Sequence, residues 1–149
     1  MPCLSAAKLS LSDQIFILIG ISSHAVIISK DLPEPSVLLL KADYGSGAWG
    51  VPGGALDPEE TIHEALLREC VEELGVLVQI NYLTGVYYHK AYNSRVFIFL
   101  CELPQAAQIC LSDEHSEYRF APISSLPDVQ KQRVEDCLYY NGTVISRKY

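Results

Sequence analysis

Three glutamates near the middle of the chain are spaced so that a helix would place them on one side. Glu69, Glu72 and Glu73 stand at positions i, i+3 and i+4, where Cβ atoms lie about 5–6 Å apart and like charges repel. A hard divalent cation between the carboxylates removes that repulsion, and Mg²⁺ prefers such oxygen ligands. The spacing therefore predicts half of a magnesium site that processes phosphate groups.

Such a site would do hydrolytic chemistry. A metal ion polarises a phosphoryl group, lowers the pKa of a bound water and neutralises a departing diphosphate. A carboxylate that binds no metal can accept the proton of that water. Arg68 can pair with Glu60 or Glu72 and fix its orientation. The segment Asp43–Gly54 is rich in glycine, which lets backbone carbonyls approach a metal ion or a phosphate closely.

The helix that would carry these glutamates has clear limits in the sequence. Residues 62–74 are predicted to form an amphipathic helix, with Thr61 and Glu64 as a capping box. Gly75 is its expected stop. At 100° per residue, the apolar side of this helix carries Leu66, Leu67, Cys70 and Leu74.

Runs rich in β-forming residues surround this helix. Strands are predicted at Gln14–Ile28, Ser36–Lys41, Val76–Tyr88, Arg95–Leu103 and Arg119–Ile123, and a closing helix at Asp128–Tyr140. We expect loops over Asp43–Gly54 and Gln105–Tyr118, and a mobile or loosely docked start over residues 1–13. The 149 residues fit one domain, with a mixed sheet between helices.

Composition argues against several classes of protein. Hydrophobic residues make up 49% of the chain and charged residues 19%, which argues against disorder. A net charge of −7 without a dense Lys/Arg cluster argues against binding of duplex nucleic acid. No apolar run approaches the ~20 residues that span a bilayer.

The cysteines bear on the compartment. The five cysteines form no zinc or disulfide pattern, so a reducing compartment, the cytoplasm, is expected. The run Ile15–Ile21 could pass for a short secretory signal. Asp13 at its start and the strand-like continuation to Ile28 favour a strand instead.

The combined pattern is more specific than any of its parts. From Gly54 to Val76 the chain reads G-x5-E-x7-R-E-U-x-E-E-x-G-U, where U is a bulky apolar residue. This is the signature of the Nudix hydrolases, which the chain resembles. The one departure is Cys70 at the first U position, and a buried cysteine behaves as a small hydrophobe. Trp49–Gly54 resembles the family's W-x-x-P-G-G lead-in, and Leu111–Ile123 is similar to its downstream acidic loop and strand.

The resemblance implies a fold, a reaction and a set of site residues. The fold would be the family's α/β/α sandwich, as a single domain of residues 1–149. The reaction would be hydrolysis of a nucleoside diphosphate linked to another moiety, with Mg²⁺ or Mn²⁺. The implied metal ligands are Gly53 through its carbonyl, Glu69, Glu72 and Glu73. The implied catalytic residues are Glu69, Arg68 and Glu114, and Gly54 and Glu60 would support them. Asp113 and Glu117 compete with Glu114 for the role of the loop carboxylate.

Specificity in this family lies outside the signature, so the sequence indicates less about the substrate. Two aromatic residues could stack on a base and two cations could meet phosphate oxygens: Trp49, Tyr92, Lys41 and Arg95. The expected substrate is a nucleoside or deoxynucleoside triphosphate. Dinucleoside polyphosphates stay open because Tyr92 lies 16 residues past Val76, where that subgroup has a tyrosine. Nucleotide sugars and ADP-ribose form a third class.

Two other functions share this fold. One is a nucleotide-sensing module without turnover, and the other is an isomerase that acts on a prenyl diphosphate. The complete set of signature glutamates favours a hydrolase over both. The expected partner is a small nucleotide substrate, with no duplex nucleic acid and no membrane, and the resemblance also allows a homodimer.

Overall fold

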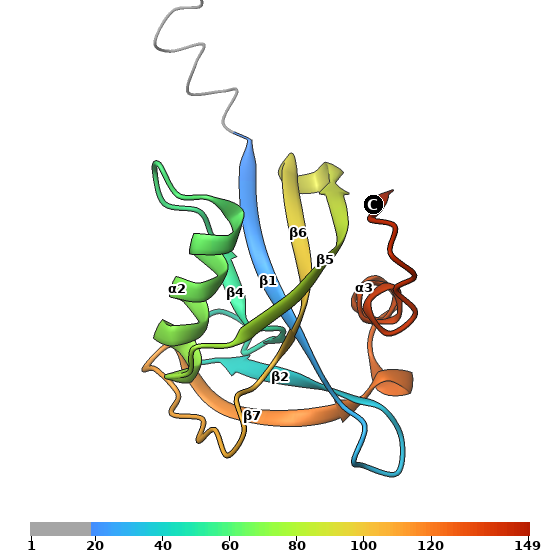
Figure 1. Ribbon diagram of the computed structural model, residues 1–149. Helices are drawn as coiled ribbons and strands as arrows, with labels where there is room; N and C mark the ends of the chain where they lie inside the picture. The colour runs from blue at the N-terminus through green and yellow to red at the C-terminus, as the bar shows by residue number, and fades with distance from the viewer. Residues whose placement is uncertain (1–18) are drawn as a thin grey trace, which may run out of the picture.

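A mixed β-sheet lies between two helices (Figure 1). The structure is a computed structural model that describes residues 19–149. Helix α2 (Ile62–Leu74) covers one side of the sheet and α3 (Asp128–Leu138) the other. The predicted α/β/α arrangement is confirmed. The expected loose start and the first part of the strand predicted at Gln14–Ile28 lie outside the described residues.

The sheet mixes parallel and antiparallel pairs. Its main path runs β3-β2-β1-β6-β5-β8, with β4 paired to β1 and β7 to β2. The pairs β1/β6 and β5/β8 are parallel, and the other pairs are antiparallel. The strands are β1 (Gly20–Ser29), β2 (Ser36–Ala42), β3 (Trp49–Gly50), β4 (Gly53–Ala55), β5 (Gln79–His89), β6 (Ser94–Glu102), β7 (His115–Pro122) and β8 (Ile145–Lys148).

The divergence of two strands makes room for the glycine-rich segment. Strand β1 pairs with β2 only at Ile28 and Ser29. Farther along, the edge of β1 pairs instead with β4, where Ser22–His24 face Gly53–Ala55. The chain between β2 and β4 therefore fills the space between the two halves of the sheet and comes to lie against α2.

Side chains of β1 alternate between two hydrophobic cores. Ala25 and Ile27 pack with Leu66 and Leu74 of α2, whereas Val26 packs with Val134 of α3. This alternation is the period of two that a strand imposes. The site-bearing helix is thus fixed against the centre of the sheet by fully buried leucines.

Helix α2 forms as the sequence predicts. The Thr61 side chain accepts the Glu64 N–H, and the Glu64 side chain accepts the Thr61 N–H. Gly75 ends the helix in the left-handed conformation with φ of 66°. All of these contacts lie between Thr61 and Gly75, so local chemistry alone sets the helix limits.

Several other elements differ from expectation. The segment Asp43–Gly54 is not all loop, because β3 and β4 lie within it or overlap its end. Strand β7 begins at His115 rather than Arg119, since it pairs with β2 from Ala42 onward. The structure also adds β8 and two 3₁₀ helices, η1 (Lys90–Tyr92) and η2 (Ile123–Ser125). These elements depend on pairing or packing with distant segments.

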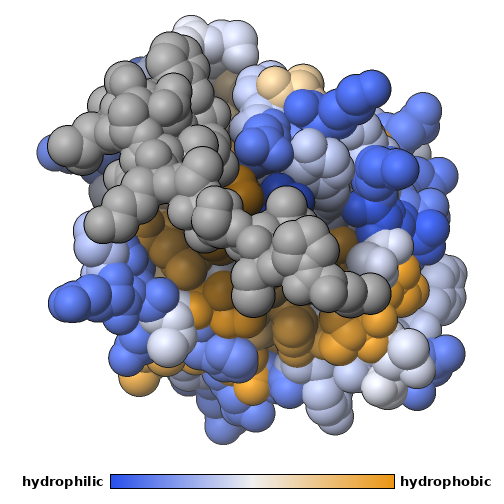
Figure 2. Space-filling model, turned by 90° about the horizontal axis from the view of Figure 1, so that it is seen from above, coloured by the Kyte–Doolittle hydropathy of each residue, from blue (hydrophilic) through white to orange (hydrophobic). Residues whose placement is uncertain are grey.

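The surface is mixed in character. Seen from above, apolar side chains gather across the lower part of one face, and hydrophilic side chains border them (Figure 2). Among residues 19–149, no helix has both the length and the apolar character that crossing a membrane requires.

Candidate active site

Arg68 of α2 is surrounded by carboxylates. Its Nε and Nη2 donate to the two oxygens of Glu60 at 2.6 and 2.9 Å, and its Nη1 donates to Glu69 at 3.0 Å and Glu72 at 3.3 Å. Asp57 lies 3.3 Å from Nε. The hydrogen bonds from Arg68 lower the pKa of Glu60. One guanidinium thus serves four carboxylates, and the cluster keeps a net negative charge.

Glu73 lies on the same helix but away from this cation. Its residue is 6% exposed, and one carboxylate oxygen accepts the Gly53 N–H at 2.9 Å. Burial raises the pKa of Glu73 to about 7, the Gly53 hydrogen bond opposes that rise, and the charges of Glu69 and Glu114 add to it. This is a buried acid held beside other acids, with no basic side chain bonded to it among residues 19–149.

Glu69 stands between these two environments. Its side chain is 15% exposed. Burial raises the pKa of Glu69, the hydrogen bond and charge of Arg68 oppose the rise, and the charges of Glu72 and Glu114 reinforce it. Glu72 differs, because its side chain is 57% exposed. The three helix glutamates therefore share a face but differ strongly in contact with water.

Glu114 approaches the helix from a docked loop. The Cys110 N–H donates to the Leu74 carbonyl at 2.8 Å, and the Ser112 N–H donates to the Glu73 carbonyl at 3.3 Å. The Glu114 carbonyl accepts the Asp43 N–H at 2.8 Å. These bonds fix the segment that the sequence predicts as an acidic loop, and they bring Glu114 near enough to raise the pKa of two helix glutamates.

Two glycines let the backbone of β4 pass close to the helix and to β1. Gly53 has a φ of 140°, and a Cβ there would collide with the backbone of Ser23 and His24. A Cβ on Gly54 would collide with the Glu69 carboxylate. The Gly53–Gly54 pair thus lets the backbone lie against Glu69 and donate the Gly53 N–H to Glu73.

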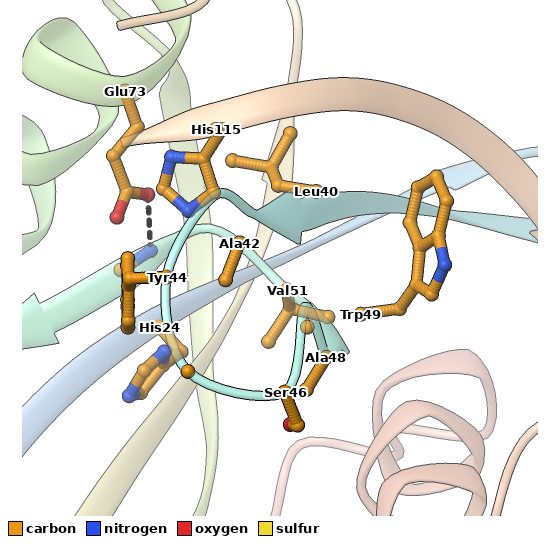
Figure 3. Close-up of a pocket in the computed structure, with 13 residues that line it drawn as sticks. His24, Leu40, Ala42, Tyr44, Ser46, Ala48, Trp49, Val51, Glu73 and His115 are labelled. Atoms are coloured by element: carbon orange, nitrogen blue, oxygen red, sulfur yellow. Dashed lines mark hydrogen bonds between the residues drawn. The ribbon is translucent and has the colours of Figure 1, made fainter. Parts of the chain in front are cut away.

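A pocket of about 360 Å³ opens beside Glu73. In Figure 3, Glu73 and His115 lie together at one side of this pocket, and Trp49 lies at the opposite side. His24 of β1 and Tyr44 of the loop after β2 also line it. The volume falls within the roughly 300–1,000 Å³ of small-molecule sites.

Residues 21–138 match the family model described as the NUDIX domain. The chain belongs to the NUDIX domain family. It is 37% identical over 83 residues to a MutT-like protein of Streptomyces ambofaciens, covering 56% of this chain and 51% of that protein. It is 29% identical over 107 residues to an ADP-ribose pyrophosphatase of Methanocaldococcus jannaschii, covering 68% and 61%. The chain thus spans roughly half to three fifths of the length of these two curated relatives.

Solved structures confirm the Nudix fold. A binary complex of an Ap4A hydrolase from C. elegans superposes with a TM-score of 0.70, covering 80% of this chain and 96% of that chain. The sequence identity in this superposition is 22%. At this sequence identity, the superposition shows that the two chains share a fold and nothing more about function.

Helix α2 offers a set of oxygen donors suited to a hard cation. Glu69, Glu72 and Glu73 are oxygen donors of the kind that Mg²⁺ prefers. Burial, and then repulsion between the acids, raises the pKa of Glu69 and Glu73, and a cation would relieve that repulsion. No three His, Cys, Asp or Glu side chains within residues 19–149 already converge on one point. Arg68 instead holds Glu69 and Glu72, and the Gly53 N–H holds Glu73. The residues fit the ion chemically, and their rotamers must turn to bind it.

The four predicted substrate contacts fall in different places. Trp49 lines the pocket beside Glu73, and the Arg119 guanidinium lies 4.2 Å from the centre of the Trp49 ring. Lys41 pairs with Glu117 at 3.1 Å on the surface. Arg95 lies over the Tyr88 ring at 4.6 Å, and Tyr92 is 76% exposed in η1. Among the four, Trp49 alone lines the pocket beside Glu73.

Sequence reasoning missed His24 and Arg133. Burial, and then the charge of Arg133, lower the pKa of His24 to about 4, so its imidazole is neutral at physiological pH. His24 looks like one more residue of a β-rich run, and Arg133 looks like a charge on a closing helix. The one available signal was the strand alternation, which puts His24 on the same side of the sheet as Val26 and α3.

Proposed function

We propose that this chain is a metal-dependent hydrolase that cleaves the diphosphate linkage of a nucleoside diphosphate derivative. The observation that carries the proposal is Glu73, a buried carboxylate next to Glu69 and Glu114 and beside an open pocket. Three acids in such positions destabilise each other unless a cation joins them. An Mg²⁺ ion supplies that charge, and a diphosphate is the group that such an ion accompanies.

The helix residues would have distinct roles. Glu69, Glu72 and Glu73 would hold Mg²⁺ or Mn²⁺, with the Gly53 carbonyl as a further ligand. The bound ion supplies charge neutralisation for the departing phosphate. Arg68 orients Glu69 and Glu72 through its hydrogen bonds and is anchored by Glu60. Glu69 and Glu72 must weaken or break their hydrogen bonds to Arg68 before their carboxylates can turn toward the ion. The strength of these hydrogen bonds therefore sets how readily the two side chains bind it.

A carboxylate must also accept the proton of the attacking water. Glu114 is one candidate, and Glu69 is the other if it acts as the base in place of binding the ion; the charges of both act on Glu73. Burial and neighbouring acids raise the pKa of Glu69, which makes it a stronger base once ionised. Glu114 comes from a loop that is bonded to the end of α2, so it can reach the site without unfolding the helix.

The substrate that fits best is a nucleoside or deoxynucleoside triphosphate. The pocket is of small-molecule size, and it offers the Trp49 ring on the side away from Glu73, whereas Tyr44 lines it on the same side as Glu73 (Figure 3). A dinucleoside polyphosphate is the second candidate. It is favoured by the exposed Tyr92 ring 6.0 Å from His89 and by the fold shared with an Ap4A hydrolase.

A hydrolysis screen that separates and identifies the nucleotide products tests the proposal. The purified chain is incubated with nucleoside triphosphates, dinucleoside polyphosphates, nucleotide sugars and ADP-ribose, each with Mg²⁺ or Mn²⁺. We expect turnover of at least one class, and a loss of about 100-fold or more in Glu72→Gln and Glu73→Gln, because each substitution removes a charged ligand.

Two results would refute this assignment. One is no turnover of any class by a folded wild type, which would favour the nucleotide-sensing alternative. The other is undiminished Mg²⁺-dependent turnover in both glutamine variants. Glu102→Gln serves as the control, since Glu102 is an exposed acid at the end of β6.

A further inference from the structure

Ser23 of β1 has a buried hydroxyl that makes no hydrogen bond. The residue is 0% exposed, and its Oγ finds no partner among residues 19–149. A serine hydroxyl can donate one hydrogen bond and accept two, and a buried polar atom that makes none is costly to the fold. Because buried polar atoms in proteins are nearly always paired, this hydroxyl calls for an explanation beyond packing.

The Ser23 side chain faces helix α2. Successive residues of a strand point to opposite sides of the sheet, and Ala25, two residues along β1, packs with the core under α2. The neighbours of Ser23 on this side of the sheet are largely apolar. Ile21 and Ala25 flank it along β1, and Phe97 stands opposite it on β6. None of these three side chains can accept a hydrogen bond.

Strand β4 brings an acid to the remaining side of Ser23. Gly54 of β4 is the residue paired with Ser23, and residues that face each other in an antiparallel pair point to the same side, with Cβ atoms about 4.5–5.5 Å apart. A Cβ on Gly54 would lie 2.6 Å from Cδ and 2.9 Å from Oε2 of Glu69. The Glu69 carboxylate therefore takes the place of a side chain at position 54, directly beside Ser23.

The Glu69 carboxylate can accept a further hydrogen bond. Within residues 19–149, its donor is Arg68, whose Nη1 bonds to Oε1 at 3.0 Å, and no described residue donates to Oε2. An ionised carboxylate has about four acceptor positions. The Glu69 side chain is only 15% exposed, so water can fill few of them. An unused donor and an unused acceptor thus lie next to each other at Gly54.

We propose that Ser23 is a positioning residue for the metal site, and that its hydroxyl donates to Glu69 when this carboxylate turns from Arg68 toward the ion. The inference rests on the proposed function, from which the ion is expected. Carboxylates that bind metal ions are themselves held by hydrogen bonds from residues behind them. Ser23 supplies such a bond from the sheet and replaces the one that Glu69 gives up at Arg68.

The test is Mn²⁺ binding to the whole chain without nucleotide, measured by calorimetry and electron paramagnetic resonance. We expect Ser23→Ala to weaken Mn²⁺ binding by about tenfold, the lower end of the loss caused by removing such a partner. Ser23→Cys keeps a weak donor and should bind Mn²⁺ with intermediate affinity. Ser36→Ala is the matched control. Ser36 of β2 is also a buried serine, but its Oγ donates to the Glu34 carbonyl, so this variant should bind Mn²⁺ as the wild type does.

Thermal unfolding in EDTA distinguishes positioning from packing. There, Ser23→Ala should keep or raise the Tm because it removes an unpaired buried hydroxyl, whereas Ser36→Ala should lower the Tm because it breaks a hydrogen bond. Added Mn²⁺ should raise the Tm of Ser23→Ala less than that of the wild type.

Three results would overturn the role of Ser23. They are unchanged Mn²⁺ affinity in Ser23→Ala, equal weakening in Ser36→Ala, and a lowered Tm of Ser23→Ala in EDTA, which would show that the hydroxyl serves the fold itself. Each of them, with normal nucleotide turnover by the wild type, leaves the proposed function standing. A folded wild type that neither binds Mn²⁺ nor turns over any nucleotide would refute both.

Discussion

At the scale of single residues, Glu73 is the group whose environment is least favourable without a cation. It is buried, its pKa is raised to about 7 by burial and neighbouring acids, and it has one hydrogen bond from Gly53. A raised carboxyl pKa means that the folded state resists ionisation. In metal-free solution, the protein should therefore lose stability as the pH rises from the unfolded pKa toward 7.

Glu73→Gln should stabilise the metal-free protein at pH 8 by about 2 kcal/mol, because a neutral amide replaces a buried anion. Mg²⁺ should raise the Tm of the wild type and leave that of Glu73→Gln nearly unchanged, since a ligand that binds the folded state stabilises it. Thermal scans in EDTA and in Mg²⁺ check both. Glu102→Gln controls for the net charge, and a Glu73→Gln protein less stable than wild type in EDTA would contradict the prediction.

The sequence predicts that Glu69, Glu72 and Glu73 act together, because a helix fixes which positions share a face. The differences in burial among these three glutamates could not be predicted from the sequence. Glu73 is buried because Gly53 and the loop carrying Glu114 cover it, and both contacts join residues far apart in sequence. The same holds for the contact of Arg133 with the Tyr87 ring, which depends on α3 facing β5.

At the scale of elements, Gly75 joins the end of α2 to the acidic loop. Its φ of 66° requires glycine or a strained residue, and a Cβ there would lie 3.2 Å from the Cys110 Cβ. The Cys110 N–H bonds to the Leu74 carbonyl directly before it. One glycine therefore ends the helix and also lets the loop dock with Glu114 facing the helix glutamates.

Gly75→Ala should lower stability by about 1–2 kcal/mol, because a left-handed backbone strains a residue with a Cβ. It should also lower kcat with the substrate found in the screen, since Cys110 must move and carries the loop with it. Gly142→Ala is the control: Gly142 has a φ of 99° but nothing within 4 Å of an added Cβ. Urea unfolding and kcat are measured for both variants. Equal effects on kcat would show that the loop contact is not involved.

The elements also differ in how far sequence predicts them. Helix α2 matches expectation at both ends, because its caps use neighbouring residues. Strands β3, β4 and β8 are two to four residues long and exist by pairing with distant strands. Such short segments carry too little periodicity to distinguish them from loop.

At the scale of the whole molecule, a polar network ties the last strand to the sheet and to α3. Asp136 of α3 accepts hydrogen bonds from Tyr87 of β5 at 2.7 Å and from Arg147 of β8 at 2.8 and 2.9 Å. Burial acts to raise the pKa of Asp136, but the hydrogen bonds from Arg147, Tyr87 and Gln132 outweigh it, and the net shift is downward. The ionised form is therefore the one that the fold stabilises.

The sign of the pH dependence follows from that shift. Because the folded pKa lies below the ordinary value near 3.8, Asp136 contributes stability above that value and loses it as the pH falls through the lower, folded pKa. Asp136→Asn should cost about 1–3 kcal/mol at pH 7, where Arg147 and Tyr87 lose a charged acceptor. The difference from wild type should shrink below about pH 4. Urea unfolding from pH 3 to 7 measures both, with Glu135→Gln as the neighbouring control, and a difference that stays constant with pH would mean that the charge of Asp136 contributes nothing.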